Sequence, residues 1–275
     1  MRVTEHERRG TETQRRRREA RFKHRHHPLL RILGVLCVSA FVFALTGCAR
    51  RRPSPLPTYR GLDDAAALHV LAQRAESVKT LSAPCGLTLT RPDGQTVQLD
   101  AAVAMEPPQR LRLRAWKFGQ AVFDLTLTPA GLWVVAPQDP GRREKVLPAT
   151  LSAAQFGREW AMLNGRFFLE HDLTTGGDAK WLSVRRKLED GRTVTCRVDR
   201  ATLTPRDYEM RDPQGVVRFR FALADYKMVE AIPWPMKLTA RSVDGRIDIR
   251  LKDVELNQEL APNAFKPPRR AEKHE

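Results

Sequence analysis

From Gly86 onward, apolar and polar residues alternate with a period of two in a series of short segments. This alternation is typical of strands in an antiparallel sheet that has one buried face and one polar face. Turn signals such as Pro92-Asp93-Gly94 and Asp244-Gly245 separate the segments and predict tight hairpins. Pro107-Pro108 and Pro233-Trp234-Pro235 are expected to lie between strands. The predicted strands cover residues 86–91, 96–105, 110–116, 121–128, 132–135, 181–188, 193–199, 207–211, 216–223, 236–243 and 247–256.

Two stretches have helical periodicity instead. The first spans residues 62–78, with Asp63 and Asp64 at the end where the helix dipole favours acidic groups. Its expected apolar face comprises Leu62, Ala65, Leu68, Ala72, Ala75 and Val78. The second spans residues 151–163 and interrupts the strands. We predict a mainly β fold with some α: a strongly curved antiparallel sheet, an unclosed half-barrel, covered by an N-terminal helix and a helical insertion.

A basic segment followed by an apolar run opens the chain. The first 31 residues hold ten arginines and one lysine against four glutamates, and no charged residue lies between Ile32 and Gly47. This order is typical of a secretory signal peptide. The apolar run has 16 residues, fewer than the roughly 20 that a spanning helix needs. We predict removal of residues 1–47 and export of the rest; an uncleaved signal anchor is the alternative.

The apolar run ends in Leu45-Thr46-Gly47-Cys48, which resembles the lipobox of bacterial lipoproteins. The resemblance implies that a signal peptidase recognises Leu45, Thr46 and Gly47 and that Cys48 is lipidated. Ala49 follows the cysteine, in place of the aspartate that some bacteria use for inner-membrane retention. We therefore expect a lipid anchor in the cell envelope, in the outer membrane and facing the periplasm.

Three regions remain after this processing. Residues 48–60 are rich in arginine and proline and are predicted to form a tether, with arginines that contact anionic head groups or, alternatively, are only solvated. Residues 61–268 are long enough to build one core, the half-barrel domain. Residues 269–275 are predicted to be a flexible tail.

Candidate catalytic chemistry is sparse in the exported part. Its histidines are His69, His171 and His274. His171-Asp172 could act as a general base, but no nucleophile motif accompanies it, and a surface turn is the simpler interpretation. The sequence has no phosphate-binding loop, dinucleotide fingerprint or zinc-ligand spacing. We predict no enzyme, no metal and no cofactor, and export argues against nucleic acid as the partner of the basic residues.

Two cysteines lie in the predicted domain, Cys85 and Cys196. Outside the cytoplasm such a pair often forms a disulfide. Cys196 is in phase with the apolar Val194 and Val198, so its side chain is expected to point inward. A disulfide and two buried free thiols are both consistent with the sequence.

The apolar faces of several predicted strands suggest a ligand. A lipid carrier would line its cavity with such residues, because an acyl chain gains about 0.8 kcal/mol for each buried methylene. An ordinary packed core would use the same residues. The candidates for acyl-chain binding are Leu111, Leu113, Phe123, Leu125, Leu127, Trp133, Phe219 and Phe221. Trp133, Phe156, Trp160 and Trp234 could cover the mouth of a cavity.

The order of several segments resembles the periplasmic lipoprotein-carrier superfamily that includes LolA and LolB. The similar segments are the lipobox, the first helix, the strand after Leu81-Ser82-Ala83, and residues 108–116, 123–134 and 256–265. The resemblance covers most of residues 62–268. It implies an unclosed barrel with a helical lid and an apolar cavity for acyl chains, and the lipid anchor favours the LolB-type acceptor over the soluble carrier.

Two functional hypotheses follow. The first is a membrane-anchored protein that binds lipid or acyl chains and acts in lipoprotein or lipid transfer and outer-membrane assembly. Its partners would be the membrane and acyl chains or lipoproteins, and its domain would be a monomer. The second is a structural or protein-interaction lipoprotein of the envelope, with a filled core and no ligand.

Overall fold

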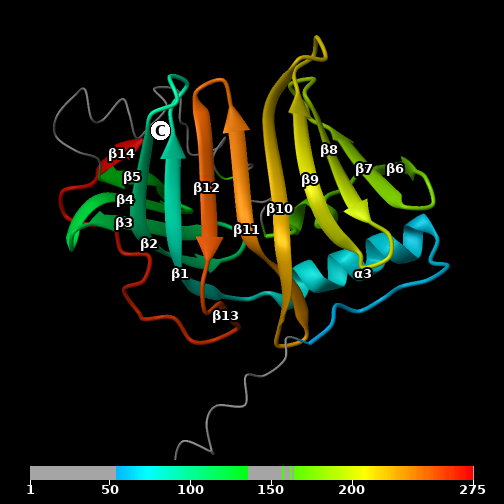
Figure 1. The fold of residues 1–275 in the computed structure, drawn as a ribbon, viewed down its shortest axis with the longest axis horizontal. Helices are drawn as coiled ribbons and strands as arrows, with labels where there is room; N and C mark the ends of the chain where they lie inside the picture. The colour runs from blue at the N-terminus through cyan, green and yellow to red at the C-terminus, as the bar shows by residue number, and fades with distance from the viewer. Residues whose placement is uncertain (1–53, 136–156, 158–161, 163, 275) are drawn as a thin grey trace, which may run out of the picture. The chain divides into compact units, whose positions relative to one another are not determined.

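The alternating segments form one antiparallel sheet in the computed structural model, which describes residues 54–135, 157, 162 and 164–274. The sheet has 14 strands in the order β14-β5-β4-β3-β2-β1-β12-β11-β10-β9-β8-β7-β6, with β13 paired to β1. Its end strands, β14 and β6, do not pair with each other, so the sheet is not closed into a barrel. Figure 1 shows the strong curvature of this sheet, with α3 on its inner side. The predicted unclosed half-barrel is confirmed.

The elements have the following bounds: α3 (Asp64–Ser77), β1 (Leu81–Thr90), β2 (Thr96–Glu106), β3 (Arg110–Lys117), β4 (Gln120–Thr128), β5 (Gly131–Val135), η1 (Arg166–Leu169), β6 (Thr174–Gly177), β7 (Trp181–Lys187), β8 (Thr193–Asp199), β9 (Thr204–Arg211), β10 (Val217–Val229), β11 (Ile232–Ser242), β12 (Gly245–Leu251), β13 (Glu255–Leu256) and β14 (Glu272–His274). Residues Pro53–Glu275 form a compact unit by themselves. The hydrophobic core is built from residues of this unit. Experiments on the fold can therefore use residues Pro53–Glu275 without the first 52 residues.

Helix α3 begins where the acidic residues predicted it. The Asp63 carboxylate caps the helix by accepting a hydrogen bond of 2.7 Å from the Ala66 amide. The face that packs on the sheet, however, only partly matches the expected one, of which Ala75 and Val78 are buried. Ala67, Leu71 and Ala75 are the buried helix residues, whereas Leu62 and Ala65 are exposed. The periodicity was compatible with both faces, since alanine and leucine occur around most of the helix, and packing against the sheet selected one.

Of the two proline-containing stretches expected between strands, Pro107-Pro108 does lie between β2 and β3, whereas Pro233-Trp234-Pro235 does not. Pro233 and Pro235 lie in β11, where the prediction placed a break. They pair with Met228 and Tyr226 of β10, and β12 begins to pair with β11 only at Lys237. Proline lacks an amide hydrogen, so it is tolerated where no second strand needs that donor. The same prediction missed the first half of β1, which contains Pro84.

Two further differences concern the C-terminal region. The predicted strand over residues 247–256 is interrupted after Leu251, and Asp253 has a left-handed φ of 41°. The tail predicted to be flexible forms β14, which pairs with β5 from Glu272 to His274. β5 would otherwise be the edge of the sheet, with unpaired backbone groups, and the tail supplies their partners.

Candidate functional site: the apolar inner face of the sheet

Seven of the eight predicted acyl-chain residues lie on one face, which we call the inner face. Leu111, Phe123, Leu125, Leu127 and Phe221 are buried there, and Leu113 and Phe219 are half-buried. The pairing of β3 with β4 places Leu111, Leu113 and Ala115 directly opposite Leu127, Leu125 and Phe123. The alternation of these strands therefore identified a continuous apolar surface.

Trp133 does not belong to this surface. On β5 it alternates with the buried Leu132 and Val134, and it pairs with Thr126, whose neighbours Leu125 and Leu127 point inward. Its side chain is therefore on the outer face, and its assignment to the acyl-chain set was wrong. The short apolar run Leu132-Trp133-Val134-Val135 does not reveal which alternate residues point inward, and only pairing with β4 decides it.

The inner face is incompletely covered at one end. Leu89 pairs with Val97 of β2 and with Ile247 of β12, so these three side chains are neighbours on the same face. Val97 is 40% exposed and Ile247 is 42% exposed, although Leu87 and Leu99, two residues further along the strands, are buried. A packed sheet face thus ends in an accessible apolar rim, formed by Leu89, Val97 and Ile247.

A line of aromatic rings crosses the inner face from β10 toward η1. Phe219 and Phe221 stack with ring centroids 6.3 Å apart, and Tyr208 lies 6.5 Å from Phe221. Phe167 meets Tyr208 edge to face at 5.6 Å and Phe168 at 5.5 Å. Phe219 is half-buried, while the other four rings are buried. The rings therefore form a continuous path on the inner face, from the half-buried Phe219 to the buried Phe168.

Beneath α3 the inner face has a partly open cavity of about 60 Å³. Its walls come from α3, η1 and strands β9 to β11, and most of them are apolar. Gly165, with a φ of +76°, lies at the start of η1, and a β-carbon there would be 3.5 Å from that of Ala75. A β-carbon at that distance would make only ordinary van der Waals contact, so it is the positive φ that favours glycine at this turn into η1.

Both cysteines are buried and free. Cys85 is on β1 and Cys196 on β8, and four strands separate them in the sheet order. Adjacent strands are about 4.8 Å apart, so the disulfide that the sequence left open does not form. Burial raises the pKa of the Cys85 thiol to about 11, and burial also raises the pKa of Cys196. Both thiols therefore stay protonated at neutral pH.

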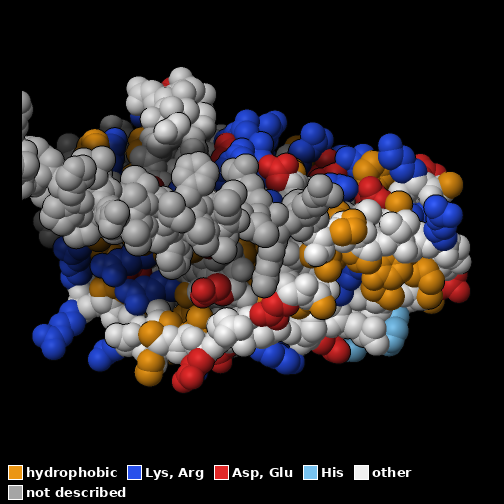
Figure 2. Space-filling view, turned by 60° about the horizontal axis from the view of Figure 1, so that its bottom comes forward, with side chains coloured by type: hydrophobic (Ala, Val, Ile, Leu, Met, Phe, Trp, Pro, Cys, Tyr) orange, Lys and Arg blue, Asp and Glu red, His pale blue; other side chains and the backbone are white. Residues whose placement is uncertain are grey.

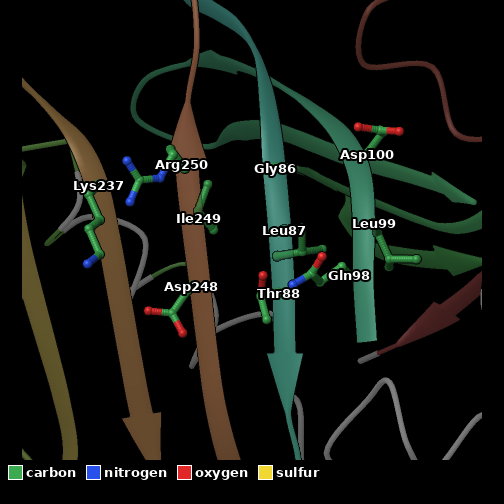
Figure 3. Close-up of a pocket in the computed structure, with 10 residues that line it drawn as sticks. All are labelled: Gly86, Leu87, Thr88, Gln98, Leu99, Asp100, Lys237, Asp248, Ile249 and Arg250. Atoms are coloured by element: carbon green, nitrogen blue, oxygen red, sulfur yellow. The ribbon is translucent and has the colours of Figure 1, made fainter. Parts of the chain in front are cut away.

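The outer face carries a polar hollow of about 540 Å³. Figure 3 shows Gly86 between Asp100 of β2 and Arg250 of β12, with Lys237 of β11 beyond the arginine. A β-carbon at Gly86 would meet nothing within 4 Å, so this glycine leaves the floor of the hollow open. Cations and carboxylates both line the hollow, and nothing in it resembles an acyl-chain site.

The arginines on the outer face are largely matched by carboxylates. Arg197 pairs with Asp207 at 2.7 Å, and Arg218 pairs with Asp212 at 2.7 Å. The space-filling view shows acidic side chains among the lysines and arginines (Figure 2). Many of the arginines that alternate with apolar residues along the strands therefore have a carboxylate beside them, so the outer face is less strongly positive than the run of arginines in the sequence suggests.

Sequence reasoning missed one exposed aromatic residue. Phe118 occupies the turn between β3 and β4, is 94% exposed and has a left-handed φ of 52°. The Lys117 ammonium lies 5.6 Å from the centre of its ring. The sequence signal that could have identified this exposed residue is a phenylalanine directly before Gly119, in the turn expected between two alternating segments.

Several predictions fall outside the described residues. They include the lipobox residues Leu45, Thr46, Gly47 and Cys48, and most of the helix expected at 151–163, with Phe156 and Trp160. Among the described residues no group of histidine, cysteine and acidic side chains is arranged to hold a metal ion, and no helix has the length and apolar character to cross a membrane.

Neither a protein-family model nor a curated protein sequence matches the chain. Solved structures do match. A DUF1329 family protein from Desulfovibrio piger aligns with a TM-score of 0.54 and 12% identity, over 74% of this chain and 98% of that one. A putative outer membrane lipoprotein-sorting protein domain from Vibrio parahaemolyticus aligns with a TM-score of 0.50 and 12% identity, over 72% of this chain and 95% of that one. This chain shares the fold of these two proteins. A LolA superfamily protein from Nitrosomonas europaea aligns with a TM-score of 0.49 and 10% identity, over 72% of this chain and 97% of that one.

The shared fold agrees with the unclosed barrel that the family resemblance noted in the sequence implies. At these identities the similarity concerns the arrangement of the chain and not its activity. The functional argument therefore rests on the side chains of the inner face.

Proposed function

We propose that this chain is a lipid-binding lipoprotein of the cell envelope that holds acyl chains against the inner face of its curved sheet. The observation that carries this proposal is the accessible rim of Leu89, Val97 and Ile247 on a face that is otherwise a buried core. Leaving such side chains in contact with water is unfavourable, and each methylene of an acyl chain buried there would contribute about 0.8 kcal/mol.

The proposed mechanism is binding without catalysis. An acyl chain would lie along the half-buried residues Leu89, Leu113 and Phe219, and the curved sheet would shield it from water. The domain would act as a monomer in lipid or lipoprotein transfer. Cys48 would tether it through the arginine- and proline-rich segment, in the outer membrane and facing the periplasm.

Phe118 supports the membrane side of this proposal. A phenylalanine that is 94% exposed beside a lysine has the amphipathic character of residues that enter the membrane interface. We propose that the Phe118 side chain enters the membrane interface when the domain meets the membrane.

One observation favours the second candidate function, a structural or interaction lipoprotein with a filled core. The cavity beneath α3 measures about 60 Å³, whereas ligand pockets usually hold about 300 Å³ or more. A complete acyl chain does not fit in this cavity, so under our proposal most of the chain must lie outside it.

Native mass spectrometry of residues Pro53–Glu275, purified after export to a bacterial periplasm, tests the proposal. We expect a bound phospholipid or acylated species that organic extraction releases and identifies. We also expect the folded protein, once freed of bound lipid, to increase the fluorescence of N-phenyl-1-naphthylamine, an uncharged apolar probe. A ligand-free mass together with no fluorescence increase would contradict lipid binding and favour the filled-core alternative.

A further inference from the structure

The outer face of the sheet has a glycine at a position where neither the backbone nor the packing requires one. Gly86 lies in the middle of β1, its φ is not positive, and a β-carbon there would meet nothing within 4 Å. Glycine weakens the interior of a strand, and there it often marks a place where a ligand approaches the backbone closely. Gly86 forms the floor of the hollow of about 540 Å³, a volume in the range of small-molecule sites.

Two cations lie next to each other on one side of this glycine. Arg250 of β12 pairs with Gly86, and Lys237 of β11 pairs with Arg250. Like charges directly opposite each other on neighbouring strands destabilise a sheet. Among the described residues neither cation forms an ion pair, although Arg197 and Arg218 on the same face do. An anion bound between Lys237 and Arg250 would relieve their repulsion.

The Asp248 carboxylate, which also lines the hollow, already has partners of its own. Its Oδ1 atom accepts hydrogen bonds from Arg246 at 2.6 Å and from the Thr239 hydroxyl at 2.7 Å. Arg246 therefore supplies the counter-charge of Asp248. Lys237 and Arg250 remain as an excess of positive charge on this side of the hollow.

The opposite side of Gly86 suits a positive group. Asp100 of β2 pairs with Gly86 and is exposed, and its carboxylate forms no hydrogen bond or ion pair within the described part of the chain. Trp116 of β3 pairs with Asp100 and is half-buried. A carboxylate accepts hydrogen bonds from an ammonium group, and the face of an indole ring attracts cations. This side therefore favours a primary ammonium group.

An open floor separates the two charged sides. Arg250 and Asp100 belong to strands two places apart in the sheet, which puts their backbones roughly 10 Å from each other. Figure 3 shows the Arg250 guanidinium extending toward Lys237 and away from Gly86, which has no side chain to fill the space. A molecule that spans this floor needs a negative group at one end and a positive group at the other.

The spacing of the charges restricts the ligand further. A phosphate has several oxygens that can accept hydrogen bonds from two adjacent cations, and arginine is well suited to phosphate. In an amino acid the ammonium and carboxylate groups are attached to the same carbon, so they are too close together to reach both sides of the floor. In phosphoethanolamine an oxygen and an ethyl linker separate the phosphorus from the nitrogen.

We propose that this hollow binds a zwitterion that carries a phosphate and a primary ammonium group, as phosphoethanolamine does. Lys237 and Arg250 hold the phosphate. Asp100 and Trp116 hold the ammonium group, and the linker lies over Gly86. The same zwitterion occurs as a lipid head group and as a free molecule. Because the hollow is on the outer face, this inference goes beyond the proposed function and does not depend on acyl binding at the inner face.

Isothermal titration calorimetry of residues Pro53–Glu275 at pH 7 tests the inference, with phosphoethanolamine, inorganic phosphate and ethanolamine as separate probes. We expect phosphoethanolamine to bind about tenfold more tightly than either of the others, since one hydrogen bond between charged groups contributes that much. Equal affinities for phosphoethanolamine and inorganic phosphate would overturn the recognition of a zwitterion. An absence of phosphoethanolamine binding at millimolar concentration would overturn the site itself.

Gly86→Val fills the floor of the hollow with a side chain that suits a strand. Because a β-carbon at Gly86 meets nothing within 4 Å, we expect this variant to keep or raise the urea midpoint and to lose phosphoethanolamine binding. Arg250→Gln should weaken the binding by about tenfold. Arg185→Gln, at an exposed position of β7, is the matched control and should leave it unchanged. Unaffected binding in Gly86→Val would contradict the proposal.

Asp100→Asn tests the ammonium side separately. We expect it to bind inorganic phosphate as the wild type does and to lose the preference for phosphoethanolamine. A purely structural role of Asp100 would not change this preference, so an unchanged preference would contradict the assignment of Asp100.

Flotation with phosphatidylcholine vesicles, with and without phosphatidylethanolamine, distinguishes the two sources of the zwitterion. If Gly86→Val reduces flotation only with the phosphatidylethanolamine vesicles, the site takes a lipid head group. If it leaves flotation unchanged but abolishes phosphoethanolamine binding, the site takes the free molecule. Both results support the site. Gly86→Val should increase the fluorescence of N-phenyl-1-naphthylamine as the wild type does, so the two proposals succeed or fail separately.

Discussion

Arg112 holds the carboxylate of Asp124 with two hydrogen bonds across strands β3 and β4. The Arg112 Nε atom is 3.0 Å from Asp124 Oδ1, and its Nη2 atom is 2.8 Å from Oδ2. Asp124 is only 4% exposed, although it lies on the outer face. Arg112 also donates to the Ala264 carbonyl at 3.1 Å, so the pair fastens the C-terminal segment over β3 and β4.

Asp124→Asn should destabilise the domain. The substitution leaves the guanidinium of Arg112, whose side chain is 20% exposed, without its counter-charge. We expect the free energy of unfolding, measured by urea denaturation of residues Pro53–Glu275, to fall by about 2–3 kcal/mol. Glu106→Gln is the control, since Glu106 and Arg110 form a pair whose side chains are 43% and 50% exposed, and its loss should cost under about 0.5 kcal/mol. Equal effects of the two substitutions would contradict this account of Asp124.

The accessible rim should be needed for acyl binding. Ile247→Asp places a charge beside Leu89 on the inner face, at a position exposed enough to tolerate it. We expect at least a fivefold weaker affinity for N-phenyl-1-naphthylamine with little change in the urea midpoint. Val243→Asp lies in the neighbouring turn, is 73% exposed in the wild type and should leave the affinity unchanged. If Ile247→Asp leaves the affinity unchanged, the rim is not part of the binding site.

The two cysteines should behave as buried free thiols. Cys85 is 2% exposed and Cys196 is fully buried, and both have raised pKa values because of burial. A thiol reagent such as 5,5′-dithiobis(2-nitrobenzoate) should react with neither in the native state and with both in urea without reductant. A count of zero thiols in urea would demonstrate a disulfide and would contradict the separation of β1 from β8.

Stability should decrease in acid, in part through Asp64. The hydrogen bond of 2.7 Å from Arg200, the main cause, lowers the pKa of the Asp64 carboxyl below its value in the unfolded chain. The stabilisation is therefore present above about pH 4 and disappears as the pH falls through the lower pKa of the folded state. Urea midpoints measured between pH 6 and pH 2.5 should fall less in Asp64→Asn than in the wild type.

Arg200→Gln removes the same hydrogen bond from its donor side. It should reproduce the reduced pH dependence of Asp64→Asn and lower the urea midpoint at pH 6. A pH dependence identical to that of the wild type in both variants would show that the Arg200–Asp64 contact does not contribute to acid sensitivity.

The sequence by itself determined the class of fold and most of its parts. Strict alternation fixed which side chains of β3 and β4 point inward, because the period of a strand leaves two choices and only one of them buries Leu111, Leu113 and Leu125. Asp63 marked the start of α3, since a helix needs an acceptor for its first amides. The pairing of consecutive strands across short turns was likewise local information, whereas the pairing of β1 with β12 was not.

The tertiary structure decided what local patterns left ambiguous. Trp133 lies in a run of four apolar residues, and only pairing with β4 placed it outside. Pro233 and Pro235 belong to a strand because β12 ends before it reaches them. The walls of the cavity beneath α3 come together only when α3, η1 and β11 pack against one another, since a cavity is formed by residues distant in the chain and has no signature in any one segment.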